Sequence, residues 1–76
     1  MNKNEQKEFN RLKRNCPQWT KWIATDFDGT VCAYNRKPKI DKLGFWRIDD
    51  KTNFEQIGES EIFKTNWRKS LYATEF

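Results

Sequence analysis

Two short apolar runs, Trp22-Ile23-Ala24 and Val31-Cys32-Ala33-Tyr34, flank a turn sequence in the stretch from Trp19 to Tyr34. Short apolar runs bounded by turn residues are typical of β-strands that are buried on both faces. The turn sequence is Asp28-Gly29, which favours a two-residue hairpin loop because both central residues of a type I′ turn adopt positive φ. The stretch therefore predicts a β-hairpin, and the other elements are expected to pack around it.

The length of the hairpin loop decides which side chains share a face. With a two-residue loop, Ile23 would lie opposite Tyr34. A four-residue loop that starts at Asp26 would shift this register by one residue and exchange the two faces. Both faces are largely apolar, so we expect a helix to cover one of them. The other face is expected either to lie under the C-terminal segment or to present Trp22 outward.

A helical pattern precedes the hairpin. Residues 2–15 are mostly polar and contain no β-branched residue, which favours a helix. Asn2 and Glu5 resemble a capping box, with Asn4 as the alternative cap, and Pro17 is expected to end the helix. One narrow apolar stripe at i, i+3 and i+7 would face the sheet. It consists of Phe9, Leu12 and Cys16.

The segments after the hairpin predict two more strands. Residues 35–39 form a basic loop that contains proline, and residues 43–48 and 53–57 read as the third and fourth strands, separated by turn-forming residues. Ser60 would cap a last helical segment, but residues 60–71 also suit a strand, and both possibilities stay open. The helical alternative places apolar residues at i, i+4 and i+8, namely Phe63, Trp67 and Leu71.

Together these elements predict one α+β domain of 76 residues. We expect a basic helix at residues 1–16, a small antiparallel sheet of three to four strands at 17–58, and a short C-terminal helix or turn at 59–76. An aromatic content of 16% would help so short a chain to bury enough surface. The expected core is Phe9, Leu12, Trp19, Ile23, Tyr34, Phe45, Ile48, Phe54, Ile57 and Trp67.

The net charge of +4 resides in the first third of the chain. Residues 1–25 carry six Lys or Arg against two Glu, residues 26–50 carry five of each sign, and residues 51–76 carry four of each. A basic patch suits phosphate or an acidic protein surface, although an ordinary solvated helix face is the commoner case. The candidate binding residues are Lys7, Arg11, Lys13, Arg14, Lys21, Trp22, Arg36, Lys37 and Lys39.

The motif Asp26-x-Asp28-x-Thr30 matches the first motif of haloacid-dehalogenase-type phosphohydrolases. In that family the first Asp is the nucleophile, the second is a general acid and base, and Mg²⁺ neutralises the site. The family needs the motif at the end of a central parallel strand, followed by several βα units. Only 46 residues follow Thr30 and they show no βαβ pattern. We therefore expect no catalytic residues and no cofactor.

Metal sites and a membrane location are also not indicated. In a calcium loop that began at Asp26, the acidic twelfth position would be Lys37. A zinc site is not expected because the chain has no His and only two cysteines, Cys16 and Cys32. The polar N-terminus lacks the apolar region of a signal peptide, and no apolar run reaches membrane-spanning length. We expect a cytoplasmic protein with reduced thiols.

A longer pattern resembles a group of small, uncharacterised accessory proteins of tailed bacteriophages. The resemblance covers roughly residues 17–71 through recurring motifs. It implies a phage origin and action in the host cytoplasm, and it implies no mechanism. The matching residues are Pro17-x-Trp19-x-x-Trp22-Ile23-Ala24-x-Asp26-x-Asp28-Gly29, Tyr34-x-x-Lys37-Pro38, Trp46 and Trp67-x-x-Ser70-Leu71.

Two functions follow as hypotheses. The first is a non-catalytic accessory protein that binds and modulates a host protein in defence, transcription or RNA machinery, with Trp, Tyr or Arg as binding hot spots. The alternative is direct RNA or DNA binding through the basic N-terminal helix and the hairpin loop. The sequence leaves the oligomeric state open.

Overall fold

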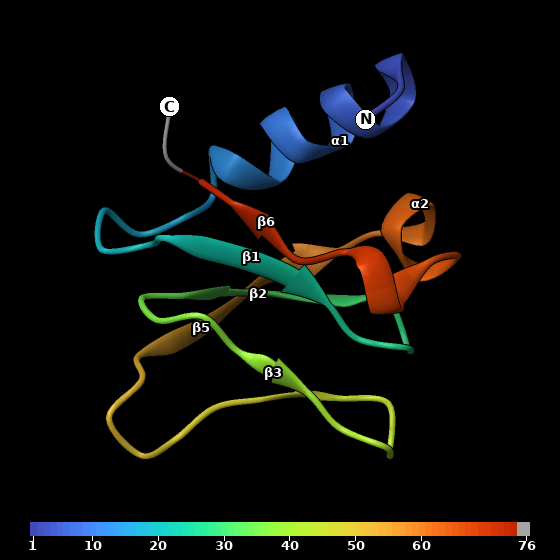
Figure 1. Cartoon of the computed structure of the whole chain (residues 1–76). Helices are drawn as coiled ribbons and strands as arrows, with labels where there is room; N and C mark the ends of the chain where they lie inside the picture. The colour runs from blue at the N-terminus through green and yellow to red at the C-terminus, as the bar shows by residue number, and fades with distance from the viewer. Residues whose placement is uncertain (75–76) are drawn as a thin grey trace.

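The computed structural model describes residues 1–74 and has an α+β architecture, which confirms the predicted fold class (Figure 1). Residues 75 and 76 of the expected C-terminal segment lie outside the described residues. The elements in chain order are α1 (Lys3–Lys13), β1 (Trp22–Thr25), β2 (Thr30–Tyr34), β3 (Lys39–Ile40), β4 (Trp46–Arg47), β5 (Phe54–Glu59), α2 (Glu61–Lys64), the 3-10 turn η1 (Trp67–Lys69) and β6 (Tyr72–Ala73).

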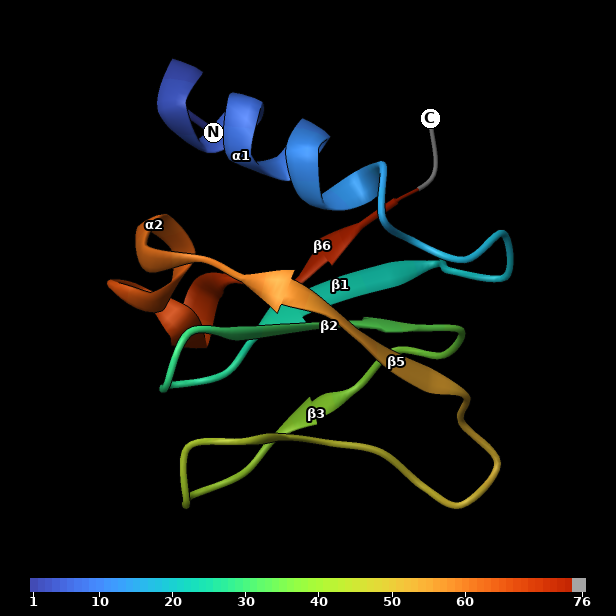
Figure 2. The same cartoon turned by 180° about the vertical axis from the view of Figure 1, so that it is seen from behind.

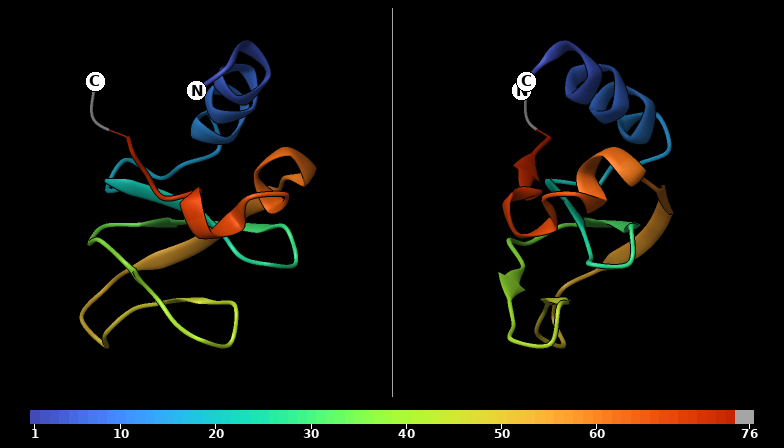
Figure 3. Two further views of the ribbon diagram at one scale, coloured as in Figure 1. Left: turned by 45° about the vertical axis from the view of Figure 1, so that its right-hand side comes forward. Right: turned by 90° about the vertical axis from the view of Figure 1, so that its right-hand side faces the viewer.

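Three layers stack in the molecule, as Figures 1 and 3 show from several sides. Helix α1 covers one face of a four-stranded antiparallel sheet with the order β5-β2-β1-β6. Strands β3 and β4 form a separate two-stranded sheet near the opposite face, here called the ribbon together with the turn that joins them. The expectation that residues 43–48 join the main sheet is wrong, because this segment contributes only β4 to the ribbon. The unpredicted strand β6 pairs with β1 instead.

Three residues, Phe27, Asp28 and Gly29, lie between the last hydrogen-bonded pair of the hairpin, Asp26 and Thr30, rather than two. The Asp26 N–H donates to Thr30 O at 2.9 Å, and the Gly29 N–H donates to Asp26 O at 2.9 Å. Gly29 has φ +93°, and no non-glycine residue within 1–74 has positive φ. The expected type I′ turn is therefore wrong, since it would need positive φ at Asp28 as well. Placing the positive φ on glycine alone avoids that steric penalty.

This loop shifts the register by one residue from the two-residue alternative and so decides which hairpin side chains share a face. Ile23 pairs with Ala33 rather than with Tyr34. One face of the sheet holds the main core beneath α1, which consists of Phe9, Leu12, Ile23, Val31, Ala33, Ile57 and Phe63. The other face holds a second cluster of Ala24, Cys32 and Tyr34, against which Trp22, Trp46, Ile48 and Leu71 pack.

Helix α1 begins with the predicted capping box. The Asn2 side chain accepts from the Glu5 N–H at 2.8 Å, and the Glu5 carboxylate accepts from the Asn2 N–H at 3.0 Å. The two bonds satisfy N–H groups that the start of a helix leaves without partners. Phe9 and Leu12 are buried against the sheet, as the apolar spacing predicts.

Half of the expected core is buried, and the other half is not. Phe9, Leu12, Ile23, Tyr34 and Ile57 are buried as expected. The remaining expectations are wrong because a chain this short has too little interior for every aromatic side chain. The exposed residues are Trp19, Phe45 and Phe54, and the half-buried ones are Ile48 and Trp67.

Residues 60–71 form neither one continuous helix nor a strand, and the strand β6 begins only at Tyr72. Ser60 caps α2 by accepting from the Phe63 N–H at 3.1 Å, as expected. The helix ends after Lys64, so the expected continuous helical stripe does not form. The turn η1 then brings Ser70 under β1, where its Oγ accepts from the Thr25 N–H at 2.9 Å. This bond ties the C-terminal segment to the hairpin.

Candidate functional site

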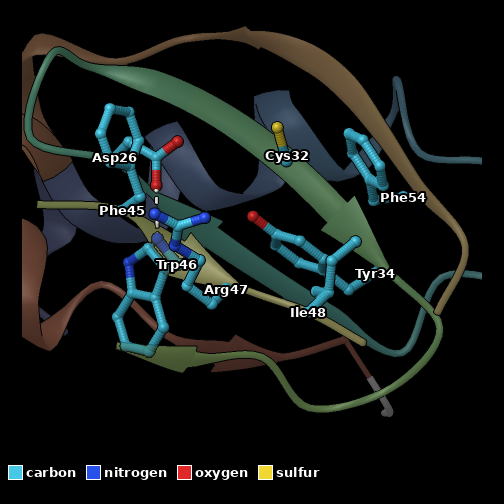
Figure 4. A pocket seen from close by; sticks show the side chains of 8 residues that line it. All are labelled: Asp26, Cys32, Tyr34, Phe45, Trp46, Arg47, Ile48 and Phe54. Carbon is cyan, nitrogen blue, oxygen red and sulfur yellow. Dashed lines mark hydrogen bonds between the residues drawn. The ribbon is translucent and has the colours of Figure 1, made fainter. Parts of the chain in front are cut away.

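An open hollow lies between the outer face of the sheet and the ribbon (Figure 4). Its volume is about 390 Å³, which lies within the range of small-ligand pockets. Strand β2 supplies its floor, the ribbon supplies one wall, and the start of β5 supplies the other. We call it the aromatic hollow. It is lined by Asp26, Cys32, Tyr34, Phe45, Trp46, Arg47, Ile48 and Phe54.

Trp46 holds the ribbon against the hairpin. Its indole N–H donates to Thr25 O at 2.9 Å, and its backbone N–H donates to Asp26 Oδ1 at 2.9 Å. The Phe27 N–H also donates to Gly44 O at 3.3 Å. The hollow therefore depends on contacts between two segments that are about 20 residues apart in sequence.

The turn of the ribbon is built around Asp41. Its Oδ1 accepts from the N–H groups of Leu43 at 2.8 Å and Phe45 at 3.1 Å, and its carboxylate also pairs with Arg47. Gly44 has φ +93°, and a Cβ there would lie 3.0 Å from the Phe27 ring. Glycine thus allows both the turn and the close approach of the Phe27 ring.

The two carboxylates of the phosphatase-like motif have structural partners. Burial raises the pKa of Asp26, against the opposing effect of the Trp46 N–H. Asp28 accepts from the Thr30 N–H at 3.0 Å, which lowers the pKa of Asp28. Both residues lie in the loop of an antiparallel hairpin rather than after a parallel strand. Their contacts account for the motif as turn chemistry, and the absence of catalysis stays a prediction.

Two neutral polar groups face the aromatic hollow. Burial raises the pKa of the Cys32 thiol to about 11, with a smaller effect from the negative charge of Asp26. Burial also raises the pKa of Tyr34 well above its usual value. Both groups therefore stay protonated near neutral pH. The hollow can accept an apolar or aromatic group that carries a polar tip, because its walls are mostly rings and its polar groups are few.

A second hollow of about 390 Å³ adjoins the first and is mainly basic. Arg47 and Ile48 line both hollows. We call its cations the basic rim: Arg36, Lys37, Lys39 and Arg47. Asp49 and Thr52 also line it, and the Thr52 hydroxyl donates to Asp49 at 2.9 Å, which lowers the pKa of Asp49. The rim thus carries more positive than negative charge.

The candidate binding residues from the sequence fall into two groups on different sides of the sheet. Four of them lie on α1 or directly after it, away from the ribbon (Figure 1): Lys7, Arg11, Lys13 and Arg14. The other five lie at the end of the hairpin, where β1 begins and β2 ends, in the loop to β3, and at the first residue of β3: Lys21, Trp22, Arg36, Lys37 and Lys39. The structure therefore does not gather all nine into one surface.

Arg11 has intramolecular partners. Its guanidinium donates to Glu8 at 2.6 Å and to Glu59 O, at the end of β5, at 2.9 Å. The Glu8 carboxylate raises the pKa of Arg11, and the bond from Arg11 lowers the pKa of Glu8. This side chain joins α1 to the edge of the sheet.

Lys37 and Trp22 form a contact in the second group. The Lys37 Nζ lies 5.3 Å from the centroid of the Trp22 ring, which is a cation–π distance. The indole is half-buried against the second cluster. The contact places a positive charge beside an aromatic surface at the end of the hairpin.

The sequence reasoning missed the apolar residues that remain exposed near the ribbon. Phe45 and Phe54 were expected in the core, but they are 40% and 58% exposed. Phe45 packs edge-on against the exposed Phe27 at 5.5 Å between ring centroids. The signal that would have found them is the aromatic content itself, which exceeds what so small a core can enclose. The large apolar side chains exposed on the ribbon or against it are Phe27, Ile40, Leu43, Phe45 and Phe54.

The remaining chemistry of residues 1–74 is limited. No group of three or more His, Cys, Asp or Glu among these residues could hold a metal ion. Cys16 and Cys32 are both free thiols. None of the helices within residues 1–74 is both long enough and apolar enough to cross a bilayer.

Comparisons with known proteins identified no relative of this chain. No family model, no curated protein and no solved structure matched this chain. The resemblance to phage accessory proteins therefore stays an expectation from the sequence.

Proposed function

We propose that this chain is a small, non-catalytic binding protein and that its partner is another protein. The partner would cover the aromatic hollow and the basic rim. Following the resemblance to phage accessory proteins, we propose a host protein in the host cytoplasm as this partner.

The observation that carries the proposal is the exposed apolar surface around the aromatic hollow. Leu43 is 71% exposed, Phe54 is 58% exposed and Phe27 is 47% exposed. Contiguous exposed apolar surface is typical of protein interaction sites. Aromatic residues are also enriched among binding hot spots, because they bury a large area with few rotatable bonds.

The charge of the basic rim narrows the class of partner. The cations beside the hollow outnumber the single carboxylate that lines it. Complementary potentials speed association and suppress wrong partners. An acidic protein surface with an apolar side chain would match both parts of this face.

Nucleic-acid binding is the second candidate, and the contact between Lys37 and Trp22 favours it. A base can stack on an aromatic ring while nearby cations contact phosphate. However, the cations of α1 lie on the other side of the sheet, so they cannot contact the phosphates of a strand that is bound at Trp22 and Lys37. The exposed apolar residues near the ribbon also have no role in phosphate contact, which is why we rank this candidate second.

The test compares two charge reversals of equal size on opposite sides of the sheet. One variant is Arg36→Glu with Lys37→Glu, and the matched control is Lys7→Glu with Arg14→Glu. The bait is the full chain, and bacterial lysate with and without nuclease treatment supplies proteins that are identified by mass spectrometry. Each captured protein is then purified for affinity measurements at low and high salt.

We expect a captured protein to lose at least about tenfold in affinity with the rim variant, equivalent to about 1.4 kcal/mol, and to keep its affinity with the α1 variant. Phe54→Ala should weaken binding by a similar factor. Loss of affinity in the α1 variant alone would overturn the assignment of this face. Binding that depends on nuclease-sensitive material and falls steeply with salt would support the second candidate instead.

A further inference from the structure

We propose that the first half of β5 is a site for β-strand addition, at which an extended acidic segment of the partner pairs with Phe54 and Gln56. The inference rests on the proposed function, since it specifies how the partner is held. Strand addition gains affinity from backbone hydrogen bonds and specificity from pockets for alternate side chains.

Strand β5 is one edge of the main sheet, and its long side is open when the molecule is seen from behind (Figure 2). The opposite edge is β6, which has only two residues. An edge strand presents a row of unpaired N–H and C=O groups unless other elements cover them. The six residues of β5 make it the longer of the two edges.

The second half of β5 is protected. Asn15 donates its side-chain amide to Ile57 O at 3.4 Å, and Arg11 donates to Glu59 O at 2.9 Å. A β-bulge also interrupts the pairing with β2 after Gln56. Side chains of α1 and a bulge are common means of keeping an edge from pairing with another chain.

The first half of β5 lacks this protection. The Asn35 N–H donates to Asn53 O at 3.1 Å, so the backbone groups of Asn53 face β2. In an antiparallel pair, successive residues point their backbone groups to alternate sides. The N–H and C=O groups of Phe54 and Gln56 therefore point outward. No residue within 1–74 hydrogen-bonds to these outward groups.

The outward groups of Phe54 and Gln56 lie next to both parts of the candidate site. The Phe54 ring stacks on Tyr34 at 6.5 Å between centroids and lines the aromatic hollow. Thr52, two residues before β5 begins, lines the basic hollow. An added strand would thus place alternate side chains beside Phe54 and carry its end toward the basic rim. Charge complementarity then selects a segment with alternating apolar residues and acidic residues at one end.

The first experiment uses short peptides as the probe. Random ten-residue peptides are selected for binding to the full chain, and the affinity of an enriched peptide is measured by fluorescence anisotropy. Each backbone nitrogen of the peptide is then methylated in turn. We expect at least a tenfold loss at alternate positions, because only every second N–H faces β5, and enrichment of acidic residues at one end. No enriched peptide, or losses without a period of two, would overturn strand addition.

The second experiment isolates a backbone donor of β5. Gln56→Pro removes the outward N–H, and proline is tolerated at edge positions whose N–H faces solvent. Gln56→Ala removes the same side chain and keeps that N–H. We expect the enriched peptide to bind the proline variant at least tenfold more weakly than the alanine variant. Equal affinities would overturn the proposal, and if the proline variant does not fold, the methylation series decides.

The two proposals fail in different ways. If Phe54→Ala and the rim variant weaken binding while Gln56→Pro and peptide methylation do not, strand addition is wrong and the proposed binding face stands. If peptide binding depends on Gln56 but is insensitive to the rim variant and to Phe54→Ala, the proposed face is wrong. Loss in all of these variants supports both.

Discussion

The backbone N–H of Trp46 donates to the Oδ1 atom of Asp26 at 2.9 Å, and this bond joins the ribbon to the loop of the hairpin. The phosphatase-like motif would make Asp26 a nucleophile, but here its carboxylate accepts a structural hydrogen bond. The same bond helps to hold the wall of the aromatic hollow. The stability of the hollow should therefore depend on this carboxylate.

Two replacements of Asp26 distinguish the role of its hydrogen-bond acceptor from the role of its negative charge. Asp26→Ala should destabilise the fold by about 1–2 kcal/mol, because it leaves the N–H of Trp46 without its partner. Asp26→Asn keeps an oxygen acceptor and should stay closer to the unmutated protein. Urea denaturation followed by tryptophan fluorescence measures both. Equal losses in the two variants would show that the hydrogen bond is not what matters at this position.

The two carboxylates of the hairpin loop should affect stability with opposite pH dependence. Burial raises the folded-state pKa of Asp26, so its stabilising contribution is present below the unfolded pKa of about 3.9 and is lost as the pH rises through the folded pKa. As the pH rises from about 3 to about 7, the unfolding free energy of Asp26→Asn should therefore increase relative to that of the unmutated protein. Urea denaturation across that range measures the difference.

Asp28 supplies the matched comparison. Its pKa is lowered by the Thr30 N–H, so its stabilising contribution is present above the unfolded pKa and is lost as the pH falls through the folded pKa. As the pH rises from about 3 to about 7, the unfolding free energy of Asp28→Asn should thus decrease relative to that of the unmutated protein. The same slope for both variants would contradict the opposite environments of the two carboxylates.

Ser70 should be important for the attachment of the C-terminal segment. Ser70→Ala would leave the buried Thr25 N–H without an acceptor, at a cost of about 1–3 kcal/mol. Thr65→Ala is the control, since that hydroxyl is exposed and only donates to Glu61 O at 3.2 Å. We expect the control to change the unfolding free energy by less than about 0.5 kcal/mol. Thermal denaturation of the two variants side by side tests this difference.

Thr25 offers a stabilising change. Its Oγ1 is buried and has no hydrogen-bond partner within residues 1–74. Thr25→Val keeps the shape of the side chain and removes the unpaired polar atom, so we expect a gain of up to about 1 kcal/mol. β-branched valine also suits a strand. A loss of stability in denaturant titration would mean that the hydroxyl has a favourable role.

The Cys32 thiol should be unreactive in the folded protein. With its pKa raised to about 11, the thiolate fraction near pH 8 is about one thousandth, against about a quarter for an ordinary cysteine. Alkylation by iodoacetamide should be about a hundredfold slower in buffer than in denaturing urea. Mass spectrometry of the peptide that contains Cys32 follows the rate. Similar rates in both conditions would place the thiol in an accessible environment.

Local patterns in the sequence predict the N-terminal helix, the hairpin and the C-terminal cap. The capping box of Asn2 and Glu5 and the cap at Ser60 can be predicted because each joins residues three positions apart. The hairpin itself follows from the two short apolar runs on either side of Asp28-Gly29. Its register does not, because hairpin loops of different lengths suit the same residues. Only φ +93° at Gly29 and the pairing of Ile23 with Ala33 decide between them.

The candidate site is less predictable than the fold. Of the candidate residues, Trp22 and Lys37 lie in contact because they flank one end of the hairpin. The sequence does not reveal that Arg11 bonds to Glu59, because those residues are 48 positions apart. Nor does it reveal that Phe45 and Phe54 stay exposed, since the same residue types would suit a core.

The sequence by itself determined the α+β class, the helix that packs through Phe9 and Leu12, and the position of the hairpin turn at Asp28-Gly29. These features depend on interactions within a few residues, where propensity and spacing are informative. Only the tertiary structure decided that the ribbon leaves the main sheet, that β6 takes the place beside β1, and that an aromatic hollow opens against a basic rim. These depend on contacts between distant segments, such as Trp46 with Asp26 and Ser70 with Thr25, whose geometry no local pattern encodes.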